Sequence, residues 1–198
     1  MRIVHISDTH NQHHKLKNLP PADLIIHSGD VSMAAEENDF IEWFCKLDYE
    51  YKIFIAGNHD YHLYEGELKV IQSYLPTNCY YLCYSGIELN GVKFWGVPYS
   101  LEDDLVLPTL KRMEEIPIDI DILISHRPPY GILDTSNYSY GCPQLLSTIQ
   151  KRLKLSYHLF GHVHSAYGII KKYKTTFINA ALTDPNYNLI KEPIIFEI

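Results

Sequence analysis

Cysteine is scarce in this sequence. The four cysteines stand at positions 45, 79, 83 and 142, without regular spacing and without the second pair that would complete a thiolate zinc site. A disulfide framework or a structural zinc site needs paired cysteines at set spacings. We therefore expect inert or partly buried thiols.

Long apolar runs are missing as well. No stretch approaches the roughly 20 apolar residues that a membrane-spanning helix needs. The sequence opens directly on the strand-like run 1–7, without the apolar stretch and cleavage site of a signal peptide. We expect a protein that does not enter the membrane and that resides in the cytoplasm.

Positive charge is in deficit. The chain has 17 Lys and Arg against 24 Asp and Glu, which gives a formal net charge of −7 with its 11 histidines neutral. Proteins that track along DNA or RNA depend on many Lys and Arg contacts to phosphates. No extended nucleic-acid groove is expected.

Repeats, low-complexity tracts and Gly/Ser linkers are absent too. A chain of 198 residues with 46% hydrophobic and 21% charged residues has an ordinary globular composition, which excludes disordered, collagenous and coiled-coil chains. Its length lies below the roughly 250 residues at which single cores begin to split. We predict a single domain over 1–198.

The sequence does contain short apolar runs, each followed at once by polar residues. Such runs are typical of strands buried on both faces, and stretches with helical spacing lie between them. The expected buried strands are 2–7, 24–28, 51–56, 120–125 and 156–160, and the expected helices are 37–49, 63–75 and 143–153. This alternation predicts a layered α/β fold.

A second group of strands extends this fold. The pair Asn90-Gly91 predicts a tight hairpin within 86–97. The segments 167–173, 175–180 and 193–198 also have the pattern of strands. A two-sheet sandwich flanked by helices accounts for this number of strands better than one open sheet.

Metal-ligand side chains stand at the end of every buried run. The carboxyl ends of strands in α/β sheets open on one crevice, so five such clusters can meet at one site. The candidate ligands, in chain order, are Asp8 and His10, Asp30, Asn58, His126, and His162 with His164. This coincidence is much stronger evidence than any single Asp-x-His or His-x-His pair.

The candidate ligands are two carboxylates, one carboxamide and four imidazoles. They are too many for one tetrahedral ion and suit two ions that share one carboxylate. Imidazole mixed with oxygen donors, and no thiolate, favours Mn, Fe, Zn, Co or Ni over Ca²⁺.

These motifs resemble the full motif set of the calcineurin-like metallophosphoesterases, from Asp8-x-His10 to Gly161-His162-x-His164. The stretches 92–98, 126–131, 141–146 and 177–181 are similar, more narrowly, to the metallophosphoesterase-domain (MPPED-like) phosphodiesterases. The resemblance implies a metallo-dependent phosphatase-like fold, a four-layer α/β/β/α sandwich, and a complete dinuclear centre, with manganese as the expected metal. It places Asp8, His10 and His164 on one metal, Asn58, His126 and His162 on the other, and Asp30 between them.

Two further residues of the third motif are assigned to catalysis. In the chemistry that the resemblance implies, a hydroxide bridging the metals, or a terminal water, attacks the phosphorus in line. His59 follows Asn58 and is not needed as a ligand, so it is free to face the substrate. We predict that His59 protonates the leaving alkoxide and that Asp60 orients its ring. Arg127 and Asn11 are candidate substrate contacts.

The remaining histidines and several tyrosines have simpler interpretations. His5, His27 and His158 lie inside apolar runs, where we expect core or supporting positions. We expect solvated positions for His13, His14 and His62. Four tyrosines, at 99, 130, 138 and 140, fall in loops near the strand ends. One of them is a candidate for stacking on a nucleobase.

The function expected from these residues is metal-dependent phosphodiester hydrolysis. The expected substrates are small nucleotide or other small diesters. The segment 29–35 lacks the Arg that protein serine/threonine phosphatases place after Gly-Asp, which disfavours a protein phosphatase. Two alternatives stay open: a metal-loaded scaffold or regulatory binding protein with little turnover, and a broad-specificity phosphomonoesterase. The sequence does not indicate an oligomeric state.

Overall fold

The first of two mixed sheets is built around four parallel strands. The computed structural model describes residues 1–34, 36–99 and 106–198. The sheet runs in the order β11-β1-β2-β3-β4, with β11 antiparallel at its edge. Its strands are β1 (Arg2–Ile6), β2 (Leu24–His27), β3 (Tyr51–Phe54), β4 (Cys79–Tyr81) and β11 (Ile194–Glu197). The predicted strands 2–7, 24–28, 51–56 and 193–198 are confirmed.

The second sheet has four parallel strands flanked by an antiparallel strand on each side. Its order is β5-β6-β7-β8-β10-β9. The strands are β5 (Ser85–Leu89), β6 (Val92–Val97), β7 (Ile122–Ser125), β8 (Tyr157–Phe160), β9 (Gly168–Lys172) and β10 (Thr175–Asn179). Asn90 and Gly91 join β5 to β6 with φ of 51° and 79°, the left-handed pair that a tight hairpin turn needs.

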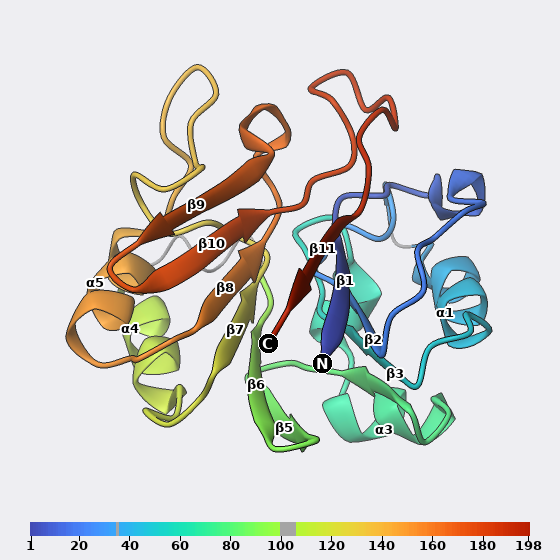
Figure 1. The fold of residues 1–198 in the computed structure, drawn as a ribbon, viewed down its shortest axis with the longest axis horizontal. Helices are drawn as coiled ribbons and strands as arrows, with labels where there is room; N and C mark the ends of the chain where they lie inside the picture. Colours follow the sequence, from blue (N-terminus) through green and yellow to red (C-terminus); the bar gives the residue numbers. More distant parts are fainter. Residues whose placement is uncertain (35, 100–105) are drawn as a thin grey trace.

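Helices cover the outer face of each sheet, as Figure 1 shows. The helices α1 (Glu37–Cys45), α2 (Tyr61–Glu65) and α3 (Leu68–Tyr74) belong to the first sheet, and α4 (Val106–Glu115) and α5 (Pro143–Lys151) to the second. Two 3₁₀ turns, η1 (His13–Lys15) and η3 (His164–Ala166), follow β1 and β8. The expected four-layer α/β/β/α sandwich is confirmed.

The prediction of one helix over 63–75 is wrong. Gly66 and Glu67 have extended backbone, with ψ of 148° and 122°, and separate α2 from α3. Glycine costs about 1 kcal/mol inside a helix, so the chain breaks where the apolar spacing alone suggested continuity. Across the described ranges, no helix is both long and apolar enough to cross a membrane.

Three hydrophobic cores hold the four layers together. Ile3 of β1 packs between the two sheets, whereas its neighbour Val4 packs against α1 on the outer face. The side chains of Ile122 and Leu123 divide in the same way on β7. Both faces of these strands are therefore buried, which explains their near-continuous apolar runs.

Histidines inside these strands should make the fold sensitive to acid. His158 is fully buried, and burial lowers its pKa from 6.5 to about 3. Below pH 6.5 the unfolded chain binds a proton that the folded protein excludes, so stability is lost as the pH falls toward 3. When the pH is lowered from 7 to 5.5, the free energy of unfolding should fall in both proteins. We expect the fall to be about 1 kcal/mol smaller in His158→Asn than in the parent protein. Urea titrations at both pH values measure this difference, and equal losses in the two proteins would contradict it.

Candidate metal centre

The candidate ligands meet where the carboxyl ends of the two sheets converge. Backbone hydrogen bonds join the segments that follow the strands, from Asp8 N–H to the Gly29 carbonyl at 3.0 Å and from Gly161 N–H to the His126 carbonyl at 3.1 Å. A parallel bridge between Ser7 and Ala181 connects the first sheet to the second. Segments far apart in the sequence therefore present their side chains to one crevice.

Four of the seven candidate ligands have left-handed backbone. The φ angles are 54° at Asp8, 42° at His10, 56° at Asp30 and 67° at His162. Each such residue costs about 1–2 kcal/mol relative to ordinary backbone. Strain of this kind persists where the surrounding structure enforces it, and it concentrates at functional sites. The left-handed backbone turns these side chains away from the strand direction and into the crevice.

The glycines of the motifs make room for ligands from other motifs. A Cβ on Gly57 would lie 2.2 Å from Asp30 Oδ1, and a Cβ on Gly161 would lie 2.1 Å from Asp8 Oδ2. These approaches are closer than any real methyl contact. Each glycine is therefore needed in its motif, because a larger residue would collide with a carboxylate of another motif.

Replacing Gly161 tests this packing. We expect Gly161→Ala to displace the Asp8 carboxylate, to destabilise the protein by about 1–3 kcal/mol and to weaken metal binding. The control is Gly91→Ala. Its added methyl enters open space, so the only cost to stability is the strain of a non-glycine residue at φ +79°. Thermal unfolding and metal content, measured on both variants, should show metal loss in Gly161→Ala alone. Full metal content in that variant would refute the steric argument.

The ligand atoms form two groups that share Asp30. In the first, His164 Nε2 lies 3.2 Å from Asp8 Oδ1 and 3.3 Å from His10 Nε2. In the second, His126 Nε2 lies 3.3 Å from Asp30 Oδ2, with His162 beside them. The same Asp30 oxygen is 3.6 Å from His10 Nε2. The Asp30 carboxylate therefore lies between the two groups.

Backbone carbonyls fix the imidazole tautomers. The Nδ1 atoms of His10, His126 and His164 lie 3.1, 2.9 and 2.9 Å from the carbonyls of Ser32, Ser28 and Asp184. A carbonyl only accepts, so each Nδ1 carries the proton and donates it. Each Nε2 is then the ring nitrogen that faces the crevice and that would bind a metal once it carries no proton, the arrangement typical of metal-ligating histidines.

Two buried polar atoms fit bound metal. His126 Nε2 and Asn58 Oδ1 lack a partner with hydrogen-bond geometry among the described residues. A buried polar atom left in this way costs about 1–3 kcal/mol. A cation between these atoms would satisfy both, and the mixed imidazole, carboxylate and amide donors suit a transition metal.

Electrostatics make the crevice a cation site. Burial alone would raise the pKa values of Asp8 and Asp30, but the imidazoles of His164 and His126 hold both well below their usual range. Burial lowers the pKa of His126, and attraction to Asp30 outweighs it and raises the value to about 9. Two ionised carboxylates lie close together in a buried site, an arrangement that divalent cations stabilise.

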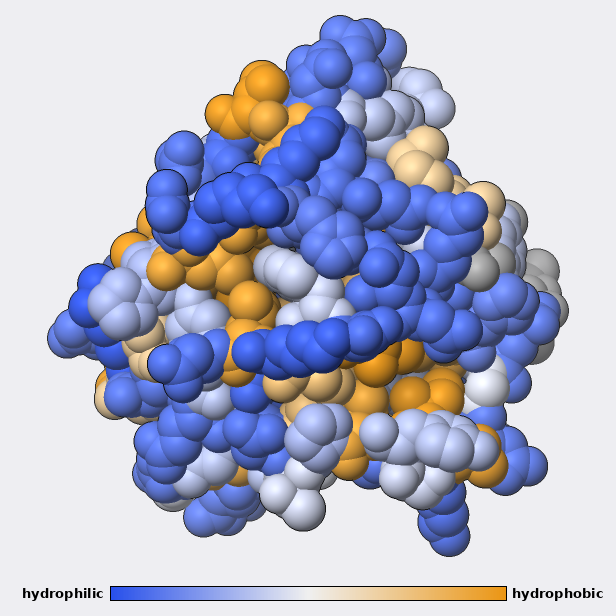
Figure 2. All heavy atoms as spheres, turned by 90° about the vertical axis from the view of Figure 1, so that its right-hand side faces the viewer, coloured by the Kyte–Doolittle hydropathy of each residue, from blue (hydrophilic) through white to orange (hydrophobic). Residues whose placement is uncertain are grey.

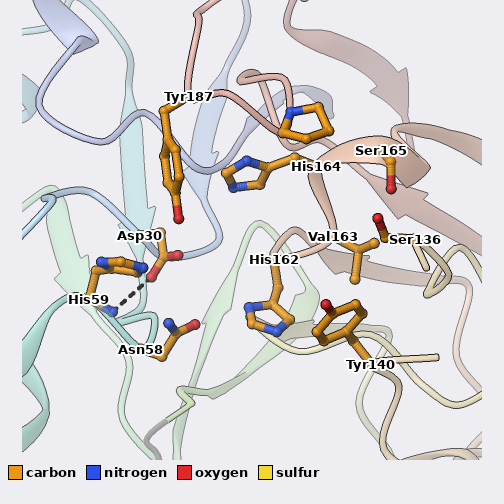
Figure 3. Close-up of a pocket in the computed structure, with 11 residues that line it drawn as sticks. Asp30, Asn58, His59, Ser136, Tyr140, His162, Val163, His164, Ser165 and Tyr187 are labelled. Atoms are coloured by element: carbon orange, nitrogen blue, oxygen red, sulfur yellow. Dashed lines mark hydrogen bonds between the residues drawn. The ribbon is translucent and has the colours of Figure 1, made fainter. Parts of the chain in front are cut away.

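His59 lies on the wall of the adjoining pocket, but Asp60 does not orient it. The His59 Nδ1 lies 2.8 Å from the Met33 carbonyl, and its backbone N–H donates to Asp30 Oδ1 at 3.0 Å, the dashed line in Figure 3. Asp60 is fully buried and accepts from the N–H groups of Gly57, Val31 and Ser32. The predicted role of Asp60 is therefore wrong, because its oxygens bind backbone and hold the motif loops together.

The two predicted substrate contacts are engaged elsewhere. Arg127 Nε donates to the Tyr140 carbonyl at 2.7 Å, and its guanidinium lies 5.3 Å from the ring centre of Tyr99. Asn11 Nδ2 donates to the Glu36 carboxylate. Neither is among the described residues that line the pocket. These contacts favour bracing roles for both side chains.

The pocket beside the ligands has a volume of about 240 Å³. Its lining includes Asp30, Asn58, His162 and His164, and on the far side Ser136, Tyr140 and Ser165 (Figure 3). Of the four tyrosines noted in the sequence, Tyr140 lines the pocket, stacked at 4.4 Å on Tyr138. Tyr99 is buried beside His162, with ring centres 5.3 Å apart.

Tyr187 is a pocket residue that the sequence analysis missed. Its ring centre lies 4.8 Å from that of His10 and 5.2 Å from that of His164, and its hydroxyl points into the pocket (Figure 3). The loop that presents it has φ of 62° at Tyr187 and is held by Asp184, which accepts from the N–H groups of Asn186 and Asn188. The available signal was the polar turn 184–188 after the parallel strand β10.

Comparisons with known proteins identify the family of the chain. The family model of the calcineurin-like phosphoesterases matches residues 1–166. The human metallophosphoesterase domain-containing protein 1 is 33% identical over an alignment that covers all of this chain and 71% of the relative. The UPF0046 protein C25E10.12 of Caenorhabditis elegans is 36% identical, with coverage of 100% and 81%.

A solved structure shares the fold. The phosphopantetheinyl hydrolase of Mycobacterium tuberculosis superposes with a TM-score of 0.62 at 14% identity, over 93% of this chain and 90% of that one. At this identity the likeness concerns architecture alone. With the family match over most of its length and the sequence relatives at full coverage, the chain belongs to the calcineurin-like phosphoesterase family.

Proposed function

We propose that this phosphoesterase hydrolyses small phosphodiesters at a dinuclear centre, with manganese as the working metal. The position of Asp30 carries the proposal, because its Oδ2 faces His10 Nε2 at 3.6 Å and His126 Nε2 at 3.3 Å. Asp8, His10 and His164 would hold one cation, and Asn58, His126 and His162 the other. Two such cations supply water activation and neutralisation of phosphoryl charge.

His59 is the proposed donor of the leaving-group proton. Its ring stands edge-on to His10 with centres 5.0 Å apart. Because the Met33 carbonyl accepts from Nδ1, the other nitrogen, Nε2, is left for the substrate. A protonated Nε2 donates to the departing alkoxide oxygen and so avoids the release of a strongly basic anion.

The pocket walls favour diesters over monoesters. The described lining residues around the ligands offer the hydroxyls of Ser136, Tyr140, Ser165 and Tyr187, and no Lys or Arg. A phosphomonoester dianion carries one more negative charge than a diester, and enzymes usually meet such charge with Arg or Lys. Neutral hydroxyls instead suit the polar, uncharged alcohol of a small diester.

A panel of esters tests the proposed function. We expect the Mn²⁺-loaded protein to hydrolyse bis(p-nitrophenyl) phosphate and 2′,3′- or 3′,5′-cyclic nucleotides faster than p-nitrophenyl phosphate, and chelation to abolish turnover. A clear preference for the monoester would favour a broad-specificity phosphomonoesterase. Two bound metals without turnover on any ester would instead favour a scaffold or regulatory binding protein.

Tyr187 should contribute one hydrogen bond to the bound phosphate. Burial, and then the negative charges of Asp30 and Asp8, raise the pKa of its hydroxyl, so it stays a donor. We expect Tyr187→Phe to keep both metals and to lower kcat/KM about tenfold, the effect of one hydrogen bond of roughly 1.4 kcal/mol. Tyr74→Phe, at an exposed position of α3, is the control. An unchanged kcat/KM in Tyr187→Phe would remove the hydroxyl from the mechanism.

A further inference from the structure

A second cluster of metal-ligand side chains lies outside the metal centre, on the outer side of the first sheet. It consists of His13 and His14 in η1 and Asp39 in α1. The predicted solvated position of His13 is wrong, because its ring is fully buried against Phe40 and Trp43, with ring centres 5.6 and 5.0 Å away.

The three side chains converge on one point. Asp39 Oδ2 lies 3.0 Å from His13 Nε2 and 3.0 Å from His14 Nε2, and the two imidazole centres are 4.3 Å apart. In tetrahedral zinc sites with bonds of about 2.0–2.1 Å, neighbouring ligand atoms lie roughly 3.3 Å apart. The cluster therefore has nearly the spacing of three zinc ligands before any ion binds.

The protonation states also suit a metal. Burial, and then the proximity of His14, lower the pKa of His13, so its imidazole is neutral at neutral pH. Hydrogen bonding to His14 lowers the pKa of Asp39, which is then a carboxylate. A neutral imidazole and an ionised carboxylate are the forms that coordinate metals.

The cluster is accessible from solvent. The side chains of His14 and Asp39 are 56% and 61% exposed. They line a hollow of about 260 Å³ together with Glu42 and Trp43. The side of the molecule that carries α1 faces the viewer in Figure 2 and is largely hydrophilic. A hydrated ion can therefore reach His14 and Asp39 from solvent, and the buried His13 nitrogen lies 3.0 Å from the Asp39 carboxylate.

We propose that His13, His14 and Asp39 bind a zinc ion, with water as the fourth ligand, since the Glu42 carboxylate pairs with Lys46. The ion ties η1 to α1. The same two parts of the chain are already joined by the hydrogen bond from Asn11 to Glu36. The site therefore braces the segment that leaves His10, without contributing a ligand to the dinuclear centre.

Zinc counting tests this site. After equilibration at micromolar free Zn²⁺, native mass spectrometry should find one more zinc ion per chain in the parent protein than in His14→Ala or Asp39→Asn. Both residues are exposed, so both variants should fold. His62→Ala is the control, since that exposed imidazole pairs with Glu37 and its loss should leave the count unchanged. Equal counts in the parent protein, His14→Ala and Asp39→Asn would overturn the proposal.

Two further measurements separate this site from the dinuclear centre. Trp43 is one of only two tryptophans, and its indole lies beside His13. Cu²⁺ used as a probe should quench its fluorescence in the parent protein and several-fold less in His14→Ala, and equal quenching would count against the site. In Asp30→Asn, which disables the proposed dinuclear centre, the outer zinc ion should remain. Its loss together with the other metals would show that the cluster does not bind zinc independently.

Discussion

Replacing Asp30 by asparagine is expected to lower kcat on diesters about a thousandfold or more, the scale on which groups at the centre of a catalytic unit act. The Asp30 carboxylate lies between His10 Nε2 and His126 Nε2, so it serves both proposed cations at once. Asparagine keeps the shape and one oxygen but removes the negative charge. The metal content should fall in parallel, which elemental analysis after dialysis measures.

The control for this variant is Asp48→Asn, the same change at an exposed carboxylate outside both clusters of metal-ligand side chains. It should retain diesterase activity. If Asp30→Asn kept two metals and full activity, the assignment of Asp30 as the shared ligand would be wrong. If it lost the metals and Asp48→Asn did not, the loss would be specific to the dinuclear centre.

Much of the fold could be predicted because buried strands require runs of apolar residues, which are visible in the sequence. Strands such as β2 and β7 are buried at every position and apolar at their first three, since one face meets the other sheet and the opposite face meets helices. The break at Gly66 and the helix α4 were not predicted. Apolar spacing continues across Gly66. In the 106–115 segment Val106, Leu110 and Met113 have helical spacing, but Pro108 within it argues against a helix.

The candidate ligands could be found because each follows its strand directly. The supporting contacts could not, since they depend on which distant segments meet. Nothing local to His59 indicates that the Met33 carbonyl holds its ring, and the neighbouring Asp60 was the natural but wrong choice. The position of Tyr187 in the pocket could not be predicted for a related reason. Its loop follows β10, which has no metal-ligand motif of its own, although it is parallel to β8 and ends at the same edge.

The proposed acid role of His59 predicts a loss that depends on the leaving group. We expect His59→Ala to slow diesters with alkyl leaving groups about a hundredfold, within the range of general acid catalysis, and activated nitrophenyl esters less than about tenfold. Alkoxides need a proton as they depart, whereas nitrophenolate is stable without one. His62→Ala, which removes a nearby imidazole bonded to Glu37, should be unaffected on both. Steady-state rates across a leaving-group series give a steeper dependence on leaving-group pKa for His59→Ala than for the parent protein. Equal losses on alkyl and nitrophenyl esters would leave His59 as a phosphate-positioning residue.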